Sequence, residues 1–326
     1  MTDVWPAIEI RPRRLGHVNL FVTSVECSLL FYGDVCGFEQ VFEEPQILAV
    51  FLGNGNTHHD LALMGVAAHA RVGRDGHVQV ASGRGSAAGL NHLGFEIETE
   101  ADLAAAIERA EKASFEFHRI VDHQISHSVY FFDPDGNYIE VYADVTRDWR
   151  RLYENSRGQL VTGSWRLADS PLSTEPMYES QPEIHVKVDA LLHPTHVARA
   201  TLVVADLERS KVFYERVVGL RTITEYHHLG GVVLGGTLGH PDLALIQQSN
   251  DEDLGLHHLS AALPLAVELD IGIARLRAAG IDIEEQFDGP SIRSIVVRDP
   301  DGVRIEFFIP SGSDSSRVVI DRHYIN

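Results

Sequence analysis

The sequence predicts an α+β fold in which four βαβββ units form two tandem domains with curved, partly open mixed sheets. Two repeated motifs predict it. The turn sequence Asp-Pro-Asp-Gly occurs at residues 133–136 and again at residues 299–302, each time between two strand-like segments. The segment His-His-Asp-Leu-Ala-Leu at residues 58–63 recurs as His-Pro-Asp-Leu-Ala-Leu at residues 240–245. Internal repetition of this kind indicates that the two halves are copies of each other.

The first Asp-Pro-Asp-Gly turn joins strands expected at residues 128–132 and 138–142, both rich in aromatic and β-branched residues. Pro134 presets φ and Gly136 supplies a positive φ, as a tight turn requires. Alternation along the second strand places Glu140 on the face opposite its apolar neighbours. Burying a lone carboxylate is costly, so Glu140 needs either water or a cation.

Each half divides again into two units of about 50–60 residues, too small to bury a core well alone. Every unit opens with an alternating strand, near residues 15–22, 90–97, 198–204 and 256–263. A helix follows, expected at residues 26–32, 102–113, 208–217 and 267–279. Two or three strands then close the unit. Asp206 suits the start of the third helix and Gly280 the end of the fourth.

The repeats predict three segments. Residues 1–146 form an N-terminal domain, and residues 193–326 form a C-terminal domain that is expected to have a structural role. Residues 147–192 between them are rich in Pro, Ser, Gly and charge, which is typical of a linker. Its aromatic residues, expected to order part of it, are Trp149, Tyr153 and Trp165.

Composition excludes several classes of partner. The formal net charge of −20 over 326 residues argues against nucleic acid and against anionic membrane surfaces. No run of about 18 apolar residues predicts a membrane span, and the first residues lack the apolar core of a secretory signal. Two cysteines, Cys27 and Cys36, are expected as free thiols. These features favour a cytoplasmic protein.

Three residues at corresponding strand positions form a candidate metal site. His17 and His92 alternate with apolar neighbours in their strands, as Glu140 does in its own. A single strand histidine is more often structural than a ligand, but three such residues in repeated units favour metal. Two imidazoles and one carboxylate make a facial triad, which is typical of open non-haem Fe(II) sites.

The second half supplies an internal comparison. Its residue at the position of His17 is Arg199, which stays protonated and cannot ligate. His258 and Glu306 remain, so Arg199 is expected to pair with Glu306 in place of a metal. The sequence leaves open whether these three residues have any binding role.

The motifs together resemble the vicinal oxygen chelate superfamily, which holds glyoxalases, bleomycin resistance proteins and extradiol dioxygenases. The closest resemblance is to type I extradiol ring-cleaving dioxygenases of the catechol 2,3-dioxygenase kind. It covers residues 17–145 closely and residues 198–308 more loosely. The motifs that carry it are Gly-His-Val-Asn-Leu at 16–20, His-His-Asp-Leu-Ala-Leu at 58–63, Asn-His-Leu at 91–93, and Tyr130 ten residues before Glu140.

The resemblance implies an oxidoreductase that opens a catecholic or hydroquinone-like ring with O₂, using Fe(II) or, alternatively, Mn(II). His59 matches the histidine that assists O₂ activation. Tyr130 matches the tyrosine that hydrogen-bonds the substrate oxygen near the metal. His123 matches a further catalytic histidine. Because the loop from His123 to Tyr130 is shorter than in the larger two-domain enzymes, His127 is an alternative for this role.

One departure from that family matters. Its common two-domain enzymes carry the metal in the C-terminal half, whereas the intact set here lies in the N-terminal half. Pocket residues therefore do not transfer, and they are expected to come from loops and the linker. The resemblance also implies that subunits can pair through exposed strand edges, although the sequence leaves the oligomeric state open.

Two other functions are alternatives to ring cleavage within the same fold. A glyoxalase-like lyase or isomerase would use Zn, Ni or Mn to polarise a carbonyl or enediolate without O₂. A metal-free binding or resistance protein would keep the fold and lack the triad.

Overall fold

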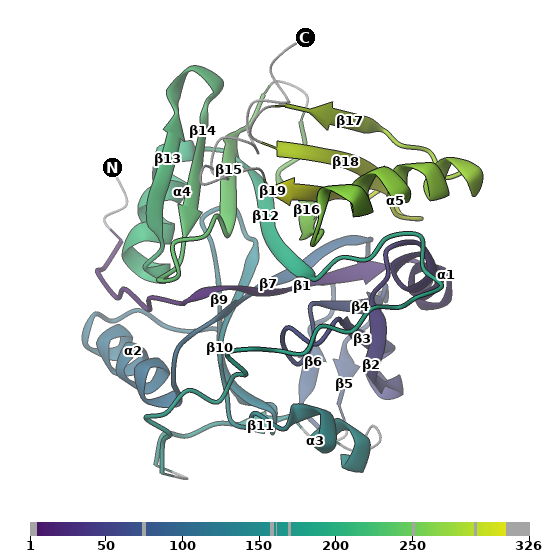
Figure 1. Ribbon diagram of the computed structural model, residues 1–326. Coiled ribbons are helices and arrows are strands. Elements are labelled where there is room, and N and C mark those ends of the chain that lie inside the picture. Colours follow the sequence, from purple (N-terminus) through teal and green to yellow (C-terminus); the bar gives the residue numbers. More distant parts are fainter. Residues whose placement is uncertain are drawn as a thin grey trace.

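The computed structural model describes residues 5–73, 76–156, 160, 162–168, 171–249, 252–289 and 292–310. Two domains lie against each other, and their first strands, β1 (Arg14–Val22) and β12 (His196–Val204), pack together at the boundary (Figure 1). The N-terminal domain holds a nine-stranded mixed sheet and the C-terminal domain an eight-stranded one. The predicted α+β fold with tandem domains is confirmed.

The N-terminal domain contains two βαβββ units. The first consists of β1 (Arg14–Val22), α1 (Val25–Leu30), which continues as a π-helical turn (Phe31–Val35), β2 (Glu39–Glu44), β3 (Ala49–Gly53) and β4 (Leu61–Gly65). A small hairpin, β5 (Arg71–Val72) and β6 (Val78–Val80), separates it from the second. The second consists of β7 (Gly89–Glu96), α2 (Glu100–Lys112), β8 (Arg119–Asp122), β9 (Ser126–Phe132) and β10 (Tyr138–Asp144).

The C-terminal domain repeats this order. Its first unit consists of β12 (His196–Val204), α4 (Leu207–Phe213), a π-helical turn (Tyr214–Val218), β13 (Arg221–Tyr226), β14 (Gly231–Gly235) and β15 (Leu243–Gln247). Its second consists of β16 (Gly255–Ala262), α5 (Ala266–Ala278), β17 (Glu285–Asp288), β18 (Ile292–Arg298) and β19 (Arg304–Pro310). In both domains the first strand pairs parallel with the fourth strand of its own unit and antiparallel with the first strand of the next.

The structure confirms the predicted start of α4, the predicted end of α5 and the predicted turn between β9 and β10. The Asp206 carboxylate accepts a hydrogen bond from the Arg209 backbone N–H at 3.0 Å and so caps α4. Gly280 has a φ of +72° after α5, and Gly136 has a φ of +87° in the turn between β9 and β10. These left-handed conformations favour glycine because it lacks a β-carbon.

Part of the segment predicted as a linker joins the N-terminal domain. It forms α3 (Trp149–Ser156) and β11 (Gly163–Ser164), and β11 pairs with β8 at the edge of the nine-stranded sheet. The three aromatic residues that were expected to order it, Trp149, Tyr153 and Trp165, are buried. The domain limits themselves stay a prediction.

Reciprocal hydrogen bonds join the two domains. The Tyr32 hydroxyl donates to the Asp299 carboxylate at 3.0 Å, and the Tyr214 hydroxyl donates to Asp133 at 2.8 Å. Each tyrosine follows a helix of one domain, and each aspartate opens the Asp-Pro-Asp-Gly turn of the other. The repeated turn therefore also holds the neighbouring domain.

The repeated Asp-Leu-Ala-Leu segments make a second reciprocal pair. The Asp60 carboxylate accepts the Val197 backbone N–H at 3.2 Å, and the Asp242 carboxylate accepts the Leu15 N–H at 2.9 Å. Both acceptors are buried, and each binds the first strand of the opposite domain. The domains are thus locked through matched residues of the two copies.

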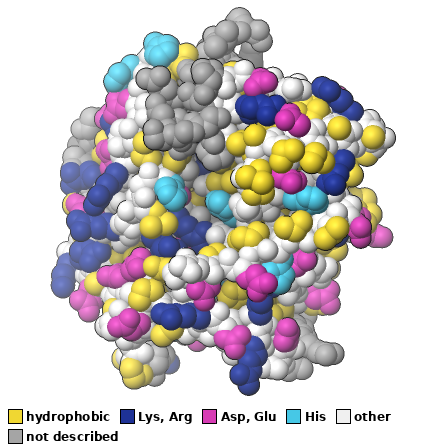
Figure 2. Space-filling view, viewed as in Figure 1, with side chains coloured by type: hydrophobic (Ala, Val, Ile, Leu, Met, Phe, Trp, Pro, Cys, Tyr) yellow, Lys and Arg dark blue, Asp and Glu magenta, His cyan; other side chains and the backbone are white. Residues whose placement is uncertain are grey.

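One face of the molecule carries exposed hydrophobic side chains. On the face in Figure 2 they gather over the region of α5, where Leu265, just before the helix, and Val267 and Ile271 within it are exposed. Self-association of the chain stays a prediction.

Cys27 and Cys36 are free thiols, as expected. Among the described helices, none combines the length and the apolar character that crossing a bilayer demands.

Candidate metal centre

The three predicted ligands come together on neighbouring strands. Nε2 of His17 on β1 lies 3.0 Å from Oε2 of Glu140 on β10, and Nε2 of His92 on β7 lies 3.0 Å from the same oxygen. The donor atoms of the three residues all lie within 4.8 Å of one another. All three side chains are buried. Two imidazole nitrogens and a carboxylate oxygen converging at this spacing fit a divalent cation.

The strand register places these residues. His17 and Glu140 are both cross-strand neighbours of Gly94 on β7, one from each side. A register shift between Leu15 and His17 marks a bulge in β1, which re-aims the side chain that follows. The three side chains therefore lie on one face of the sheet, as alternation along their strands predicted.

The charge states suit metal binding. Burial alone would raise the pKa of Glu140, but His17 and His92 beside it hold the pKa well below its usual range. Burial lowers the pKa of His17 to about 4. The site therefore offers a carboxylate and a neutral imidazole at neutral pH, which are the forms that ligate.

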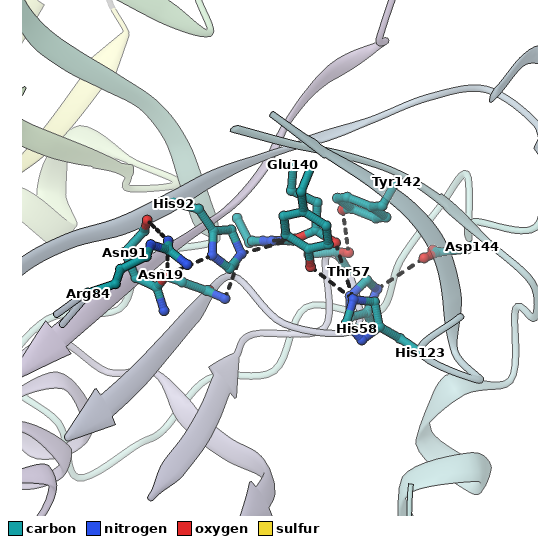
Figure 3. Close-up of polar contacts among 12 residues, drawn as sticks. Asn19, Thr57, His58, Arg84, Asn91, His92, His123, Glu140, Tyr142 and Asp144 are labelled. Atoms are coloured by element: carbon teal, nitrogen blue, oxygen red, sulfur yellow. Dashed lines mark hydrogen bonds and ion pairs between the residues drawn. The ribbon is translucent and has the colours of Figure 1, made fainter. Parts of the chain in front are cut away.

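Neighbours of His92 fix its orientation. Its Nδ1 lies 3.2 Å from the side-chain oxygen of Asn91, which also accepts a hydrogen bond from Arg84 at 2.6 Å. Because that oxygen only accepts, Nδ1 of His92 carries the proton and Nε2 is left with its lone pair toward Glu140. Figure 3 shows Arg84 and Asn91 on one side of His92 and Glu140 on the other.

Sequence reasoning missed both of these supporting residues. Asn91 directly precedes His92, and that adjacency was the available signal. Arg84 lies in a Gly-Arg-Gly segment at residues 83–85, and no sequence pattern connects that segment with β7.

The paired histidines of the first repeated segment are buried beside the triad. The ring of His59 stacks on that of His17, with centroids 4.2 Å apart and planes at 30°. Neither ring nitrogen of His59 has a hydrogen-bond partner among the described residues. Burial, together with the nearby histidines, holds the pKa of His59 well below its usual range, so the ring is neutral. Both histidines of the pair are therefore interior residues.

His58 has a different environment from His59. Its Nδ1 lies 3.0 Å from the Asp144 carboxylate, and both side chains are buried (Figure 3). Burial works against the charged ring, but the Asp144 carboxylate outweighs it and raises the pKa of His58. No sequence motif links His58 with Asp144, because Asp144 lies beyond the motif that ends at Glu140.

Tyr130 and His123 meet on the other side of the triad. Tyr130 is the cross-strand neighbour of Glu140, and its hydroxyl lies 2.9 Å from Nε2 of His123. That nitrogen is 3.8 Å from Oε1 of Glu140. Burial lowers the pKa of His123 to about 4 and keeps that of Tyr130 well above its usual range. The tyrosine is therefore a neutral phenol that can donate.

His127, the alternative to His123, faces away from the site. It bonds to Glu100 at 2.6 Å and stacks on Trp165 with centroids 4.2 Å apart. Its position on β9 has the opposite parity to Tyr130. Of the two candidates, only His123 lies beside the triad.

A cavity of about 120 Å³ opens over His92 and Glu140. Its walls include His58, His59, His123 and Tyr130. The segment predicted as a linker contributes Tyr153, Leu160 and Thr162, as expected for a pocket built partly from that segment. A largely apolar wall with a few convergent polar groups is typical of a small-molecule site.

The corresponding position of the C-terminal domain holds an ion pair. Arg199 donates to Glu306 at 2.9 Å, as the sequence predicted, and Ser260 and Ser294 donate to the same carboxylate. Nε2 of His258 lies 3.9 Å from it. The guanidinium supplies the positive charge beside Glu306.

Comparison with known proteins points to one protein family. The sequence profile of the Glyoxalase/Bleomycin resistance protein/Dioxygenase superfamily matches residues 14–141 and 194–307. The chain is 28% identical over 308 residues to a catechol-2,3-dioxygenase of Bacillus subtilis (strain 168), covering 90% of this chain and 97% of that protein.

Solved structures share the fold. The 2,3-dioxygenase LapB from Pseudomonas sp. KL28 has a TM-score of 0.64 at 16% identity, over 92% of this chain and 93% of that one. The Mn(II)-bound glyoxalase from Novosphingobium aromaticivorans has a TM-score of 0.61 at 16% identity, over 92% and 82% of the two chains. With both repeats matched by the family profile, this chain belongs to the glyoxalase/bleomycin resistance protein/dioxygenase superfamily.

Proposed function

We propose that this protein is an extradiol-type dioxygenase that opens the ring of a catecholic or hydroquinone-like aromatic with O₂. The observation that carries the proposal is the convergence of His17, His92 and Glu140 beneath a cavity that also presents His59 and Tyr130. A relative named catechol-2,3-dioxygenase over 90% of the chain supports it. The N-terminal domain would carry the reaction and the C-terminal domain would support it.

His17, His92 and Glu140 would hold Fe(II), or alternatively Mn(II), since the same donors serve both. When bound, such an ion supplies a Lewis acid that favours the deprotonated diol and leaves coordination positions open to substrate and O₂. The remaining work falls to residues of the chain around the cavity.

Three of these residues have the geometry for separate tasks. Tyr130, a neutral phenol beside Glu140, would donate a hydrogen bond to a substrate oxygen and stabilise charge on it. Neither ring nitrogen of His59 has a hydrogen-bond partner in the described part of the chain and the ring is neutral, so it can accept a proton and return it during oxygen chemistry. His123, bonded to Tyr130, would orient that hydroxyl and carry protons toward the cavity mouth.

A second candidate is a glyoxalase-like lyase or isomerase. The likeness to the Mn(II)-bound glyoxalase favours it, because that protein shares the fold over 92% of this chain. Such a reaction needs the metal and a base, and it needs no O₂.

The test begins with elemental analysis of protein purified without oxygen, followed by O₂ uptake against a panel of dihydroxybenzenes. The dioxygenase predicts one bound iron or manganese ion per chain, O₂ consumption matched to diol loss, and a product heavier by two oxygen atoms. His17→Ala should abolish metal binding and turnover, whereas His227→Ala, at an exposed histidine, should change neither. Turnover of a 2-oxoaldehyde–thiol adduct without O₂ would favour the lyase.

A further inference from the structure

Two arginines line the cavity without a carboxylate partner among the described residues. Arg84 and Arg119 both contribute to its wall. Arg84 donates through Nη2 to the backbone and side-chain oxygens of Asn91, and Arg119 donates through Nη1 to the Gln79 carbonyl at 3.3 Å. Within the described part of the chain, neither guanidinium forms an ion pair, although the protein has 47 acidic and 27 basic residues. Each keeps N–H donors available to a ligand.

The strand register fixes where Arg119 lies relative to the triad. Arg119 on β8 is the cross-strand neighbour of Tyr130 on β9, and Tyr130 is the neighbour of Glu140 on β10. With strands about 4.8 Å apart, the backbone of Arg119 lies roughly 10 Å from that of Glu140. All three side chains line the same cavity. The row therefore runs from the candidate metal centre, past Tyr130, to a cation.

Arg84 reaches the same side of the cavity by a different route. Its guanidinium carbon lies 3.9 Å from the centroid of the Tyr138 ring, and Tyr138 stacks on Tyr130 with centroids 5.2 Å apart. The stacking and the bonds to Asn91 hold the guanidinium in place before any ligand arrives.

Other elements contribute polar residues, among them Glu44 and Gln79, and an apolar part of the wall. That apolar part includes Phe42, Phe51, Ile125, Tyr153 and Leu160, and Phe42 stacks on Tyr153 with centroids 4.6 Å apart. An aromatic ring would find an apolar surface there. The cavity thus has an apolar wall for a ring and a cationic region beyond Tyr130.

We propose that Arg84 and Arg119 form an anion subsite and that the substrate is an aromatic diol bearing a carboxylate. The inference rests on the proposed function, because the diol is what would place the ring over the triad. The arginine fork matches a carboxylate geometrically, and such charge-assisted bonds are stronger than neutral ones. A carboxylate in the subsite would also neutralise two cations that have no counter-ion in the described part of the chain.

The test compares a vicinal dihydroxybenzoate with its neutral methyl ester on the iron-loaded protein. The expected kcat/KM is at least about 10-fold higher for the acid. Arg119→Gln should lower kcat/KM for the acid by about 10- to 100-fold, the range for bonds to charged groups, and leave that for the ester nearly unchanged. Arg119 is the cleaner position, because Arg84 also supports Asn91 beside His92. Arg147→Gln, at an exposed arginine bonded to the Pro176 carbonyl, is the matched control.

Anaerobic calorimetric titration separates the two proposals. Preference for the acid that disappears in Arg119→Gln, with neither compound consumed under O₂, would support the subsite and overturn the ring-opening reaction. Equal kcat/KM and equal affinity for acid and ester in the wild-type protein would overturn the subsite while the reaction stands. This last comparison needs no variant, so an Arg119 variant that fails to fold leaves the test intact.

Discussion

A β-carbon built on Gly94 would lie 2.1 Å from Nε2 of His17, so the imidazole occupies space that any other residue at position 94 would fill. The C-terminal domain shows the alternative. There the cross-strand partner of Arg199 is Ser260, in the register that pairs His17 with Gly94. The candidate metal centre therefore depends on a glycine as well as on its three ligands.

Gly94→Ala should displace the His17 ring and weaken Fe(II) affinity by about 10- to 100-fold, as loss of ligand positioning commonly does. The donor residues stay the same, so the change tests geometry alone. Metal titration of the chelator-treated protein measures it. Gly163→Ala is the matched control, because a β-carbon there meets no atom within 4 Å and the residue also lies in a strand. Unchanged affinity in Gly94→Ala would contradict the placement of His17.

His59→Phe should retain the metal and slow O₂-dependent turnover by a factor on the order of 10²–10⁴, the usual range for a general acid–base group. The substitution keeps an aromatic ring against His17 and removes no hydrogen bond to the described residues. Stopped-flow kinetics with metal analysis on the same sample separates the two effects. Wild-type turnover in this variant would remove His59 from the mechanism.

The sequence predicted the fold well because its signals are local or repeated. Each of the four helices of the repeated units was placed to within a few residues, whereas α3 lies in the segment predicted as a linker. The strand parity of His17, His92 and Glu140 identified the face on which they meet. Alternation along a strand decides the face on which each side chain lies. The repeated units showed which strands correspond to one another. These are the features that periodicity can encode.

Contacts between distant elements could not be predicted in the same way. The bond from Tyr32 to Asp299 joins residues of different domains, and nothing in either local sequence specifies the other. The same holds for His58 and Asp144. The loop arginine Arg84 reaches the cavity because of how its loop packs, which depends on tertiary structure rather than on pattern.

Acidification should destabilise the metal-free protein through His123. Burial lowers the pKa of its imidazole to about 4, below the ordinary value of 6.5, so the unfolded chain binds a proton that the folded chain refuses. The stability contributed by this residue is therefore complete above the unfolded pKa and is lost as the pH falls from there toward about 4. Its side chain is 25% exposed, which moderates the loss to about 1–2 kcal/mol between about pH 7 and about pH 5.

His123→Gln isolates this contribution, because glutamine does not titrate and can still bond to Tyr130. Urea unfolding of the chelator-treated proteins at the two pH values should show a smaller loss for this variant than for the wild type. Other buried groups, including Asp60 and Asp242, titrate in both proteins and cancel in the difference. His227→Gln, at a side chain that is 85% exposed, should behave as the wild type does. An equal loss in wild type and His123→Gln would contradict a neutral buried ring.

Substitutions in the C-terminal domain can test which residues a metal site of this kind requires. Arg199→His restores the two-histidine, one-carboxylate set with His258 and Glu306, but the side chain of Ser260 would stand where Gly94 makes room in the first domain. Arg199→His alone should therefore bind no second metal ion. It should also lose about 3–5 kcal/mol of stability, because Glu306 is left buried without its cation.

Adding Ser260→Gly removes the obstruction, and the double variant should bind a second Fe(II) or Zn(II) ion whose charge replaces that of the guanidinium. Elemental analysis should show two ions per chain, and added metal should restore much of the lost resistance to urea. The single variant serves as the control for both measurements. Two ions in the single variant would show that Gly94 is not required for the geometry. One ion in a folded double variant would show that the site of the first domain needs more than its three ligands and this glycine, with the Asn91 contact to His92 as the next feature to transfer.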